Sequence, residues 1–283
     1  MTAARAPTAT TQAVILARGL GSRMRNGGSA AAAAGGLTDE QLRAADAGQK
    51  GMMPIGRPFL EYVLSTLADA GITDVTLVVG PGPQAVREHF TLTAPPARVR
   101  VHFAVQEEPR GTADAVLAAD GVVHGAPFVV LNADNFYPAE AFRDLAAVGG
   151  DGLVAFEEEA LVALGNIGRE RVLKYALLDI GSDGFLREIR EKPAPDDPLA
   201  RRAERWVSMN LWSFTPRIFD ACRLVRPSPR GELELQEAVM IAIRDLGMQF
   251  RVVPMRAGVL DLSERGDVAT VAARLACESA PRP

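Results

Sequence analysis

The stretch that most constrains the fold of this chain runs from Ala13 to Arg25, AVILARGLGSRMR, where an apolar run leads directly into a glycine-rich turn. The run at 13–16 is short, uninterrupted and partly β-branched, which is typical of a central parallel strand covered on both faces. Gly19 and Gly21 allow backbone conformations that other residues avoid, and Arg23 adds a fixed positive charge. A strand leading into a phosphate-binding loop is the simplest interpretation.

This loop matches neither of the two common phosphate-binding motifs. The dinucleotide fingerprint requires a third glycine where Met24 stands, and the P-loop requires a Gly-Lys-Ser/Thr ending that is absent from this loop. An ordinary strand-to-helix turn is therefore an equal alternative. Residues further along the chain have to decide between the two interpretations.

Length, charge and cysteine content exclude several classes of protein. The chain has 283 residues, 48% of them hydrophobic, and a net charge of −4, so it can bury a large α/β core but has no overall basic field for nucleic acid or an anionic membrane. Residues 1–11 lack the apolar segment of a signal peptide, and no run approaches the roughly 20 apolar residues of a membrane span. Cys222 and Cys277 lack metal-ligand spacing, which predicts two buried free thiols in a reducing cytoplasm.

Apolar periodicity predicts alternating strands and helices in the first half of the chain. Strands are expected at 13–16, 74–79, 99–105 and 127–131, and helices at 58–70, 84–90 and 111–119. This alternation predicts a mainly parallel sheet that binds its ligand at the carboxyl ends of the strands. In the second half, strands at 153–156, 175–180, 185–191 and 206–214 have a more antiparallel character, with a hairpin turn at 181–184. Further helices are expected at 216–224, 233–246 and 267–277, and a strand at 250–254.

These elements predict one domain made of two halves, residues 12–150 and 151–277. Residues 26–49 are expected to form a flexible insertion, because they begin with a low-complexity run of alanine and glycine. Thr38 and Gln41 have the spacing of a helix cap, which predicts a short helix at the end of the insertion.

Five charged residues at the ends of separate segments need a common explanation: Arg23, Lys50, Asp134, Lys192 and Asp261. Taken singly, each has an ordinary alternative, such as a surface lysine or a turn-forming aspartate. Together they suit phosphate transfer. The two aspartates are hard oxygen ligands for Mg²⁺, while the arginine and the lysines would neutralise phosphate oxygens. Such chemistry needs no nucleophilic serine or cysteine.

The sequence resembles the sugar-1-phosphate nucleotidylyltransferases, and most closely the glucose-1-phosphate thymidylyltransferases and uridylyltransferases, from about residue 12 to 276. The glycine loop, followed by Lys50 and Pro54, matches the signature of that family. Further motifs follow in the family's order: QEEPRG at 106–111, Asp134 in ADNFY, EKP at 191–193, RGELE at 230–234, and Asp261. The resemblance implies a Rossmann-like mixed sheet, mainly parallel and flanked by helices, with a smaller antiparallel part that binds the sugar.

The resemblance also implies roles for individual residues. Arg23, Lys50 and Lys192 would be catalytic, the first two holding the triphosphate and the third the sugar phosphate. Asp134 and Asp261 would hold Mg²⁺. The remaining nucleotide and sugar contacts would come from Leu16, Ala17, Arg18, Gly19, Gly21, Ser22, Gln106, Gly111, Thr112, Glu191 and Arg230. Among these, the amide of Gln106 could offer a donor and an acceptor to a uracil-type base, Glu191 would bind sugar hydroxyls, and Arg230 would assist Lys192.

The implied reaction is attack of a sugar-1-phosphate on the α-phosphorus of UTP or dTTP, which yields an NDP-sugar and pyrophosphate. Assembly into a homo-oligomer would also be typical of the family. Arg18 stands where the family has a small residue, and the long insertion before Lys50 could displace that lysine or place it on a lid. Ala176 and Asn210 keep a non-sugar phosphate, such as a cyclitol or alcohol phosphate, open as the acceptor. A catalytically silent regulatory relative is a third alternative.

Overall fold

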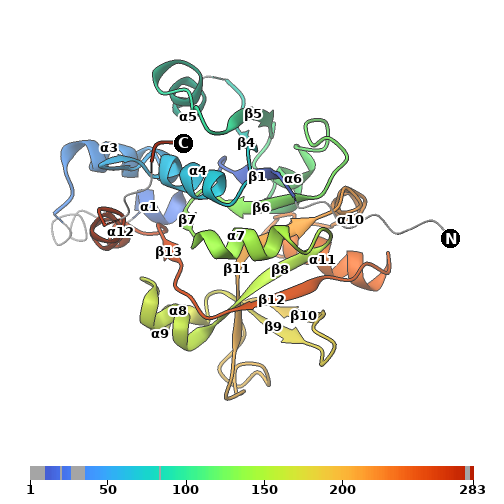
Figure 1. The fold of residues 1–283 in the computed structure, drawn as a ribbon. Helices are drawn as coiled ribbons and strands as arrows, with labels where there is room; N and C mark the ends of the chain where they lie inside the picture. The colour runs from blue at the N-terminus through green and yellow to red at the C-terminus, as the bar shows by residue number, and fades with distance from the viewer. Residues whose placement is uncertain (1–9, 20, 27–35, 83, 278–280) are drawn as a thin grey trace.

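A nine-stranded sheet forms the centre of the protein. The structure, a computed structural model, describes residues 10–19, 21–26, 36–82, 84–277 and 281–283. Within these residues the strands run in the order β10-β9-β11-β6-β1-β4-β5, and β8 joins the sheet through β11 and carries β12 (Figure 1). The strands are β1 (Gln12–Leu16), β4 (Asp74–Val79), β5 (Arg100–Val105), β6 (Phe128–Asn132), β8 (Gly152–Glu157), β9 (Ala176–Ile180), β10 (Leu186–Arg190), β11 (Trp206–Phe214) and β12 (Arg251–Met255).

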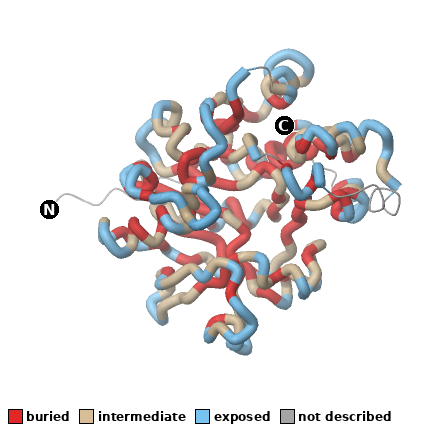
Figure 2. Tube along the Cα trace, turned by 180° about the vertical axis from the view of Figure 1, so that it is seen from behind, coloured by how far each residue is buried: buried red, intermediate tan, exposed pale blue. Residues whose placement is uncertain are grey.

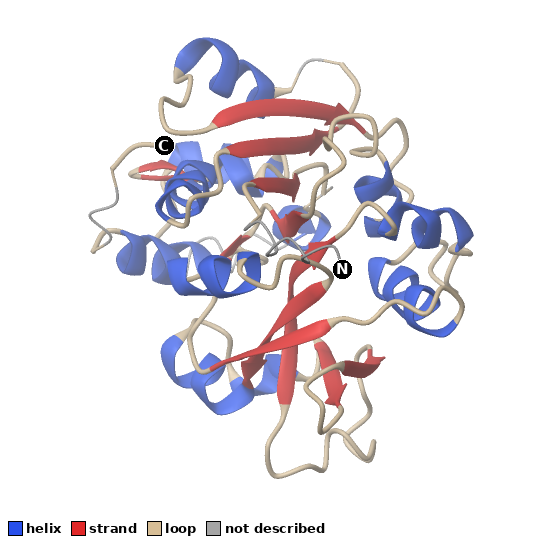
Figure 3. Cartoon of the chain, turned by 45° about the vertical axis from the view of Figure 1, so that its right-hand side comes forward, coloured by secondary structure: helices blue, strands red, loops and turns tan. Residues whose placement is uncertain are grey.

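The N-terminal part of the sheet is parallel, whereas the C-terminal part is mixed. β1 pairs in parallel with β4 and β6, and β4 pairs in parallel with β5. The nine-residue strand β11 pairs antiparallel with β6, β8 and β9 and so joins the two parts into one sheet. Figure 3 shows how steeply the strand direction turns from one part to the other.

Helices cover both faces of the sheet because its central strands are apolar on both sides. Ala13 and Ile15 of β1 pack into the cluster that contains α4 and α7, while Val14 packs into the cluster of α6, α10 and α11. Figure 2 shows the buried chain gathered between these layers. The longer helices are α3 (Asp39–Asp46), α4 (Phe59–Asp69), α6 (Thr112–Leu117), α7 (Ala139–Ala146), α8 (Glu158–Leu164), α10 (Ile218–Leu224), α11 (Leu235–Arg244) and α12 (Asp267–Leu275).

Shorter elements lie at the ends of the strands and in the loops. The helical turns are α1 (Ser22–Asn26), η1 (Lys50–Met52), α5 (Ala85–Glu88), η2 (His89–Thr93) and α9 (Arg169–Val172). Two small antiparallel ladders pair β2 (Pro54–Ile55) with β3 (Arg57–Pro58), and β7 (Asn135–Phe136) with β13 (Leu260–Asp261). No helix in the described ranges is long and apolar enough to cross a bilayer.

The strands and helices predicted from the sequence are confirmed, with small shifts at their ends, and so is the hairpin turn at 181–184. α3 carries the reciprocal Thr38–Gln41 cap. Within the predicted insertion, 26–49, residues 27–35 lie outside the described residues. The structure adds α7, α8 and α9. The prediction of two buried thiols is right for Cys222 and wrong for Cys277, because α12 ends at Leu275 and leaves Cys277 exposed.

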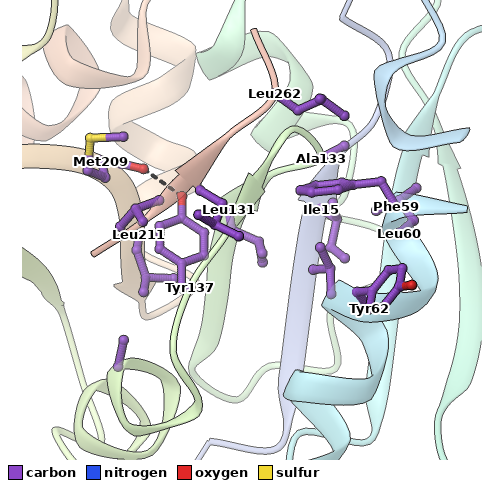
Figure 4. Close-up of a cluster of buried hydrophobic side chains, with 14 of the residues drawn as sticks. Ile15, Phe59, Leu60, Tyr62, Leu131, Ala133, Tyr137, Met209, Leu211 and Leu262 are labelled. Carbon is purple, nitrogen blue, oxygen red and sulfur yellow. Dashed lines mark hydrogen bonds between the residues drawn. The ribbon is translucent and has the colours of Figure 1, made fainter. Parts of the chain in front are cut away.

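The core beneath the sheet's carboxyl edge fixes the two segments that carry Asp134 and Asp261. Ala133 and Leu262 are both buried in the cluster formed with α4 (Figure 4). The Leu262 backbone N–H donates to the Asp134 carbonyl at 2.8 Å. Because each aspartate is next to a buried neighbour, its side chain is held at the margin of the core.

Candidate functional site

A polar cavity of about 300 Å³ lies at the carboxyl edge of the central strands. Ten of the predicted site residues line it: Gly21, Ser22, Arg23, Lys50, Thr112, Asp134, Glu191, Lys192, Arg230 and Asp261. The structure therefore brings together residues from both halves of the sequence. The position agrees with the rule that parallel sheets bind ligands beyond the carboxyl ends of their strands.

The glycine loop after β1 is joined by backbone packing to the turn before Lys50. Gly21 has φ +57°, and a Cβ on it would lie 2.5 Å from the Gly48 carbonyl oxygen. Such a contact is sterically forbidden, so a residue with a side chain cannot occupy this position without a shift of the backbone. The Lys50 N–H then donates to the Gly48 carbonyl at 3.0 Å. The close packing of Gly21 on Gly48 therefore fixes the position of the turn that leads into Lys50.

Lys50 reaches the pocket despite the long insertion that precedes it. Its Nζ lies 2.8 Å from Asp134 Oδ2, and both side chains are about one-fifth exposed, at 18% and 20%. Asp134 follows β6 and lies opposite the end of β1, where the Ala133 N–H donates to the Leu16 carbonyl at 3.3 Å. The insertion therefore does not displace Lys50 from the pocket.

Asp261 is brought beside Asp134 by the β7–β13 ladder, in which Asp261 pairs with Asn135. Asn166 holds the Asp261 backbone from both sides: its side chain accepts from the Asp261 N–H at 2.7 Å and donates to the Asp261 carbonyl at 2.8 Å. Burial, together with the charge of Asp134, raises the pKa of Asp261 to about 6.

Donors surround both carboxylate oxygens of Asp261. Oδ1 accepts from Asn135 Nδ2 at 3.1 Å and from Ser263 Oγ at 2.9 Å. Oδ2 accepts from Arg171 Nη2 at 2.7 Å and from the Tyr175 hydroxyl at 2.9 Å. A carboxylate has about four acceptor positions, so the side chain of Asp261 is fully hydrogen-bonded.

Arg171 bridges this carboxylate to α12. Its Nη1 lies 2.6 Å from Asp267 Oδ1, and its own side chain is 13% exposed. The guanidinium thus ties the start of α12 and the β13 strand to the short helix α9. It also lines the pocket, together with Lys174 and Tyr175.

Two carboxylates at the floor of the pocket suit a divalent cation that also binds substrate phosphates. No group of three or more Asp, Glu, His or Cys side chains suited to a metal occurs among the described residues. Mg²⁺ does not need one, because it usually binds one or two carboxylates and keeps water or phosphate as its other ligands. The donor chemistry of Asp134 and Asp261 therefore fits, provided that Asp261 gives up one of its present donors.

The far side of the pocket contains backbone strain. Lys192, just after β10, has φ 43°, and Asn210 in β11 has φ 59°; within the described residues these are the non-glycine positions with positive φ. The pairing of β11 with β8 shifts register between Ser208 and Trp212, which turns Asn210 out of the ladder. Its Oδ1 accepts from Gln236 Nε2 at 3.0 Å. Such strain is common at functional sites, where the surroundings hold it in place.

Glu191 and Arg230 add charge to this side. Burial raises the pKa of Glu191, and the negative charge of Glu234 adds to the effect. Arg230 is exposed and donates to Glu234 at 2.8 Å. Its guanidinium is therefore already paired with a carboxylate that also lines the pocket.

Gly111 and Thr112 lie where α6 meets the segment before α11. Gly111 has φ +127°, and a Cβ on it would lie 2.6 Å from the Leu233 nitrogen. The Thr112 hydroxyl accepts from the Leu235 N–H at 2.9 Å. These two residues dock the RGELE segment against α6, and Thr112 also faces the pocket.

Six predicted nucleotide contacts lie outside the lining of this pocket: Leu16, Ala17, Arg18, Gly19, Gln106 and Gly111. One expectation needs correction. Gln106 Nε2 donates to the Gly111 carbonyl at 3.0 Å and to Asp114 Oδ2 at 2.8 Å, so both of its amide hydrogens are used inside the protein. Gln106 can therefore present only its oxygen to a base, not a donor and an acceptor together.

Residues that sequence reasoning did not assign complete the pocket. They include Asn135, Arg171, Lys174, Tyr175, Ser208, Glu232, Glu234, Gln236 and Ser263. Asn135 and Ser263 adjoin predicted residues and could have been found from that proximity. Arg171 belongs to no recognisable sequence motif, and it meets Asp261, 90 residues further along the chain, only in the folded protein.

Comparison with known proteins identifies the family. Residues 45–258 match the family model described as nucleotidyl transferase. The chain belongs to this family. It is therefore an enzyme of the nucleotidyltransferase class, as the sequence motifs predict.

Individual relatives agree with this assignment. The chain is 28% identical to the UTP–glucose-1-phosphate uridylyltransferase AglF of Haloferax volcanii, over 82% of this chain and 84% of that protein. It is 32% identical to a glucose-1-phosphate thymidylyltransferase of Streptomyces antibioticus, over 65% of this chain and 48% of that protein. A solved structure of UDP-glucose pyrophosphorylase complexed with UDP-glucose matches with a TM-score of 0.68 at 16% identity, over 95% of this chain and 99% of that one. This match confirms the predicted fold class.

Proposed function

We propose that this nucleotidyltransferase joins UTP or dTTP to a sugar-1-phosphate and releases pyrophosphate. The observation that carries the proposal is the meeting of Lys50, Asp134 and Asp261 with Glu191 and Lys192 around one polar cavity. Relatives named as uridylyltransferases and thymidylyltransferases of glucose-1-phosphate support the same reaction.

The residues divide into a nucleotide side and a sugar-phosphate side. On the nucleotide side, Arg23 and Lys50 would neutralise the triphosphate. On the other side, Lys192 and Arg230 would hold the sugar phosphate, and Glu191 would accept hydrogen bonds from sugar hydroxyls. Catalysis of this kind depends on positioning two phosphates in line and on stabilising the charge that develops between them.

Asp134 and Asp261 would hold Mg²⁺. When bound, the ion supplies charge neutralisation at the phosphates that react. To hold the ion, Asp261 would have to release one of its present donors, such as Arg171, which lies 2.7 Å from Oδ2. Lys50 is already 2.8 Å from Asp134 and so remains beside any phosphate that this carboxylate helps to hold.

The test is pyrophosphate release with Mg²⁺, with each nucleoside triphosphate screened against sugar-1-phosphates and against cyclitol and alcohol phosphates. We expect UTP or dTTP with a hexose-1-phosphate to give the highest rate. Turnover only with a cyclitol or alcohol phosphate would identify the non-sugar alternative. Absence of turnover with every pair, from a folded protein, would contradict the proposal and favour a silent relative.

Two variants test the assignment of roles. Asp134→Asn removes a charge with little change in volume and should lower turnover by orders of magnitude while leaving the melting temperature near that of the wild type. Lys192→Ala should lower kcat and raise KM for the sugar phosphate. Wild-type kinetics in either variant would show that the residue has no part in the reaction.

A further inference from the structure

Arg18 is a charged residue of the glycine loop to which the proposed function gives no role. It follows β1 by two positions and is half-buried, and its Nη2 donates to the Glu107 carbonyl oxygen at 3.0 Å. Glu107 comes just after β5. The guanidinium therefore extends from the end of β1 to the end of β5, along the carboxyl edge on which the parallel strands finish.

The fold leaves space for this side chain. A Cβ on Gly80, directly after β4, would lie 3.1 Å from Arg18 Nε, which is closer than an unstrained contact allows. Gly80 is buried. The Arg18 side chain thus occupies space that a larger residue at position 80 would take up. It is held between the ends of β1, β4 and β5.

One nitrogen of the Arg18 guanidinium has no hydrogen-bond partner among the described residues. Nη1 is buried and has no hydrogen-bond partner, and in the described part of the chain no carboxylate forms an ion pair with Arg18. Buried donors are nearly always satisfied, and an unsatisfied one on a charged group is costly. A ligand acceptor at Nη1 would remove that cost.

Gln106, directly after β5, supplies a hydrogen-bond acceptor to complement the free donor of Arg18. Gln106 precedes Glu107, the residue that holds Arg18, and its two amide hydrogens are committed to Gly111 and Asp114. Both of those partners are acceptors, which fixes the orientation of the amide. Gln106 therefore has only its oxygen left for a ligand, one residue before the carbonyl to which Arg18 donates.

We propose that Arg18 selects the nucleobase, with Nη1 donating to a keto oxygen of the base while Gln106 Oε1 accepts the adjacent ring N–H. Uracil, thymine and guanine present a keto oxygen next to a ring N–H. Cytosine and adenine present an exocyclic amine next to an unprotonated ring nitrogen, and that edge would set a donor against Arg18. This inference rests on the proposed function for its substrate class and adds the atoms that choose among nucleotides.

Binding and turnover are both measured, so that failure of one proposal can be told from failure of the other. Affinity for UTP, dTTP, GTP, CTP and ATP is obtained by calorimetry without sugar phosphate, and pyrophosphate release is assayed separately. We expect the wild type to prefer the three keto nucleotides. Loss of turnover with intact keto preference would contradict the reaction but leave the role of Arg18 standing.

Three variants probe Arg18. Arg18→Met keeps the apolar stem, Arg18→Lys keeps the charge, and Gly80→Ala moves the guanidinium without changing it. Each should reduce the preference for UTP over CTP, by roughly 10- to 100-fold in Arg18→Met. Gly121→Ala is the matched control, because a Cβ there meets nothing within 4 Å, and it should keep the wild-type ratio.

The competing explanation is that Arg18 binds the triphosphate through its charge. In that case Arg18→Met would weaken UTP and CTP by the same factor, and Arg18→Lys would restore most of the affinity for both. Either result overturns the proposal, as does a wild type that binds CTP or ATP as well as UTP. Should Arg18→Met fail to fold, the UTP-to-CTP ratios of Arg18→Lys and Gly80→Ala decide in the same way.

Discussion

Replacing Arg171 by methionine removes a guanidinium that bridges two buried carboxylates. Arg171 contacts Asp261 Oδ2 at 2.7 Å and Asp267 Oδ1 at 2.6 Å, and the two carboxylate side chains are only 3% and 7% exposed. Methionine keeps most of the length and the apolar stem but leaves both charges without their cation. Removing one partner of a buried ion pair typically costs about 3–5 kcal/mol, because the remaining charge is uncompensated.

The measurement is thermal unfolding of Arg171→Met beside a control variant from the same short helix. A loss of 1 kcal/mol lowers Tm by roughly 2–4 °C in a domain of this size, so we expect a fall of roughly 6–20 °C. Arg169→Met is the control. Arg169 is 56% exposed and pairs mainly with Glu159, which is 63% exposed, so its loss should cost less than about 1 kcal/mol.

Equal Tm values for the two variants would refute the argument that Arg171 holds β13 to α12. A second arm adds Asp267→Asn to Arg171→Met. The amide oxygen can still accept the backbone N–H groups of Ser263 and Glu264, which now bond Asp267 at 3.1 and 2.8 Å, but the stranded charge is gone. Part of the lost Tm should return. A double variant that is as unstable as the sum of the single variants would show that the two residues are not coupled.

Three other predictions follow from single contacts. Gly21→Ala should lower both Tm and turnover, because its Cβ would lie 2.5 Å from a backbone oxygen, whereas Gly19→Ala, with nothing within 4 Å, should leave Tm unchanged; equal melting curves would contradict this. Because the pKa of Asp261 is raised to about 6, its carboxyl takes up a proton as pH falls through 6, and the Mg²⁺ concentration needed for half-maximal rate should rise there; a requirement that is constant from pH 5 to 7 would be inconsistent. Iodoacetamide should label exposed Cys277 but not Cys222, whose pKa burial raises to about 12, and mass spectrometry of the native protein checks this.

The sequence predicts the parallel part of the fold well because each signal there is local. The mostly apolar runs at 13–16 and 75–79 pack on both faces of the sheet, so their composition alone identifies central strands. α8 and α9 are different, since Gly165 and Gly168 interrupt any helical pattern. What stabilises that region is the pairing of buried Glu158 with Arg205, two residues far apart in the chain. A partner this distant cannot be read from either segment.

The candidate site is predictable to the extent that it follows strand ends. Asp134 and Lys192 each follow a predicted strand, and the topology then places both at the pocket. Arg171 was not predicted because its contact depends on the β7–β13 ladder, which joins two-residue segments with no periodic signal. The orientation of the Gln106 amide was also beyond prediction, because it depends on where Asp114 lies after α6 forms.

Two glycines of the predicted motifs act by joining distant segments. A Cβ on Gly21 would collide with the backbone of Gly48, and one on Gly111 would collide with the backbone of Leu233. The first contact sets the turn before Lys50, and the second sets the segment before α11. Because Gly48 is packed against Gly21, the position of Lys50 depends little on the length of the insertion between them. A long insertion is also tolerated energetically, since loop-closure entropy rises only slowly with length. The ion pair of Lys50 with Asp134 is thus compatible with an insertion that the family signature does not contain.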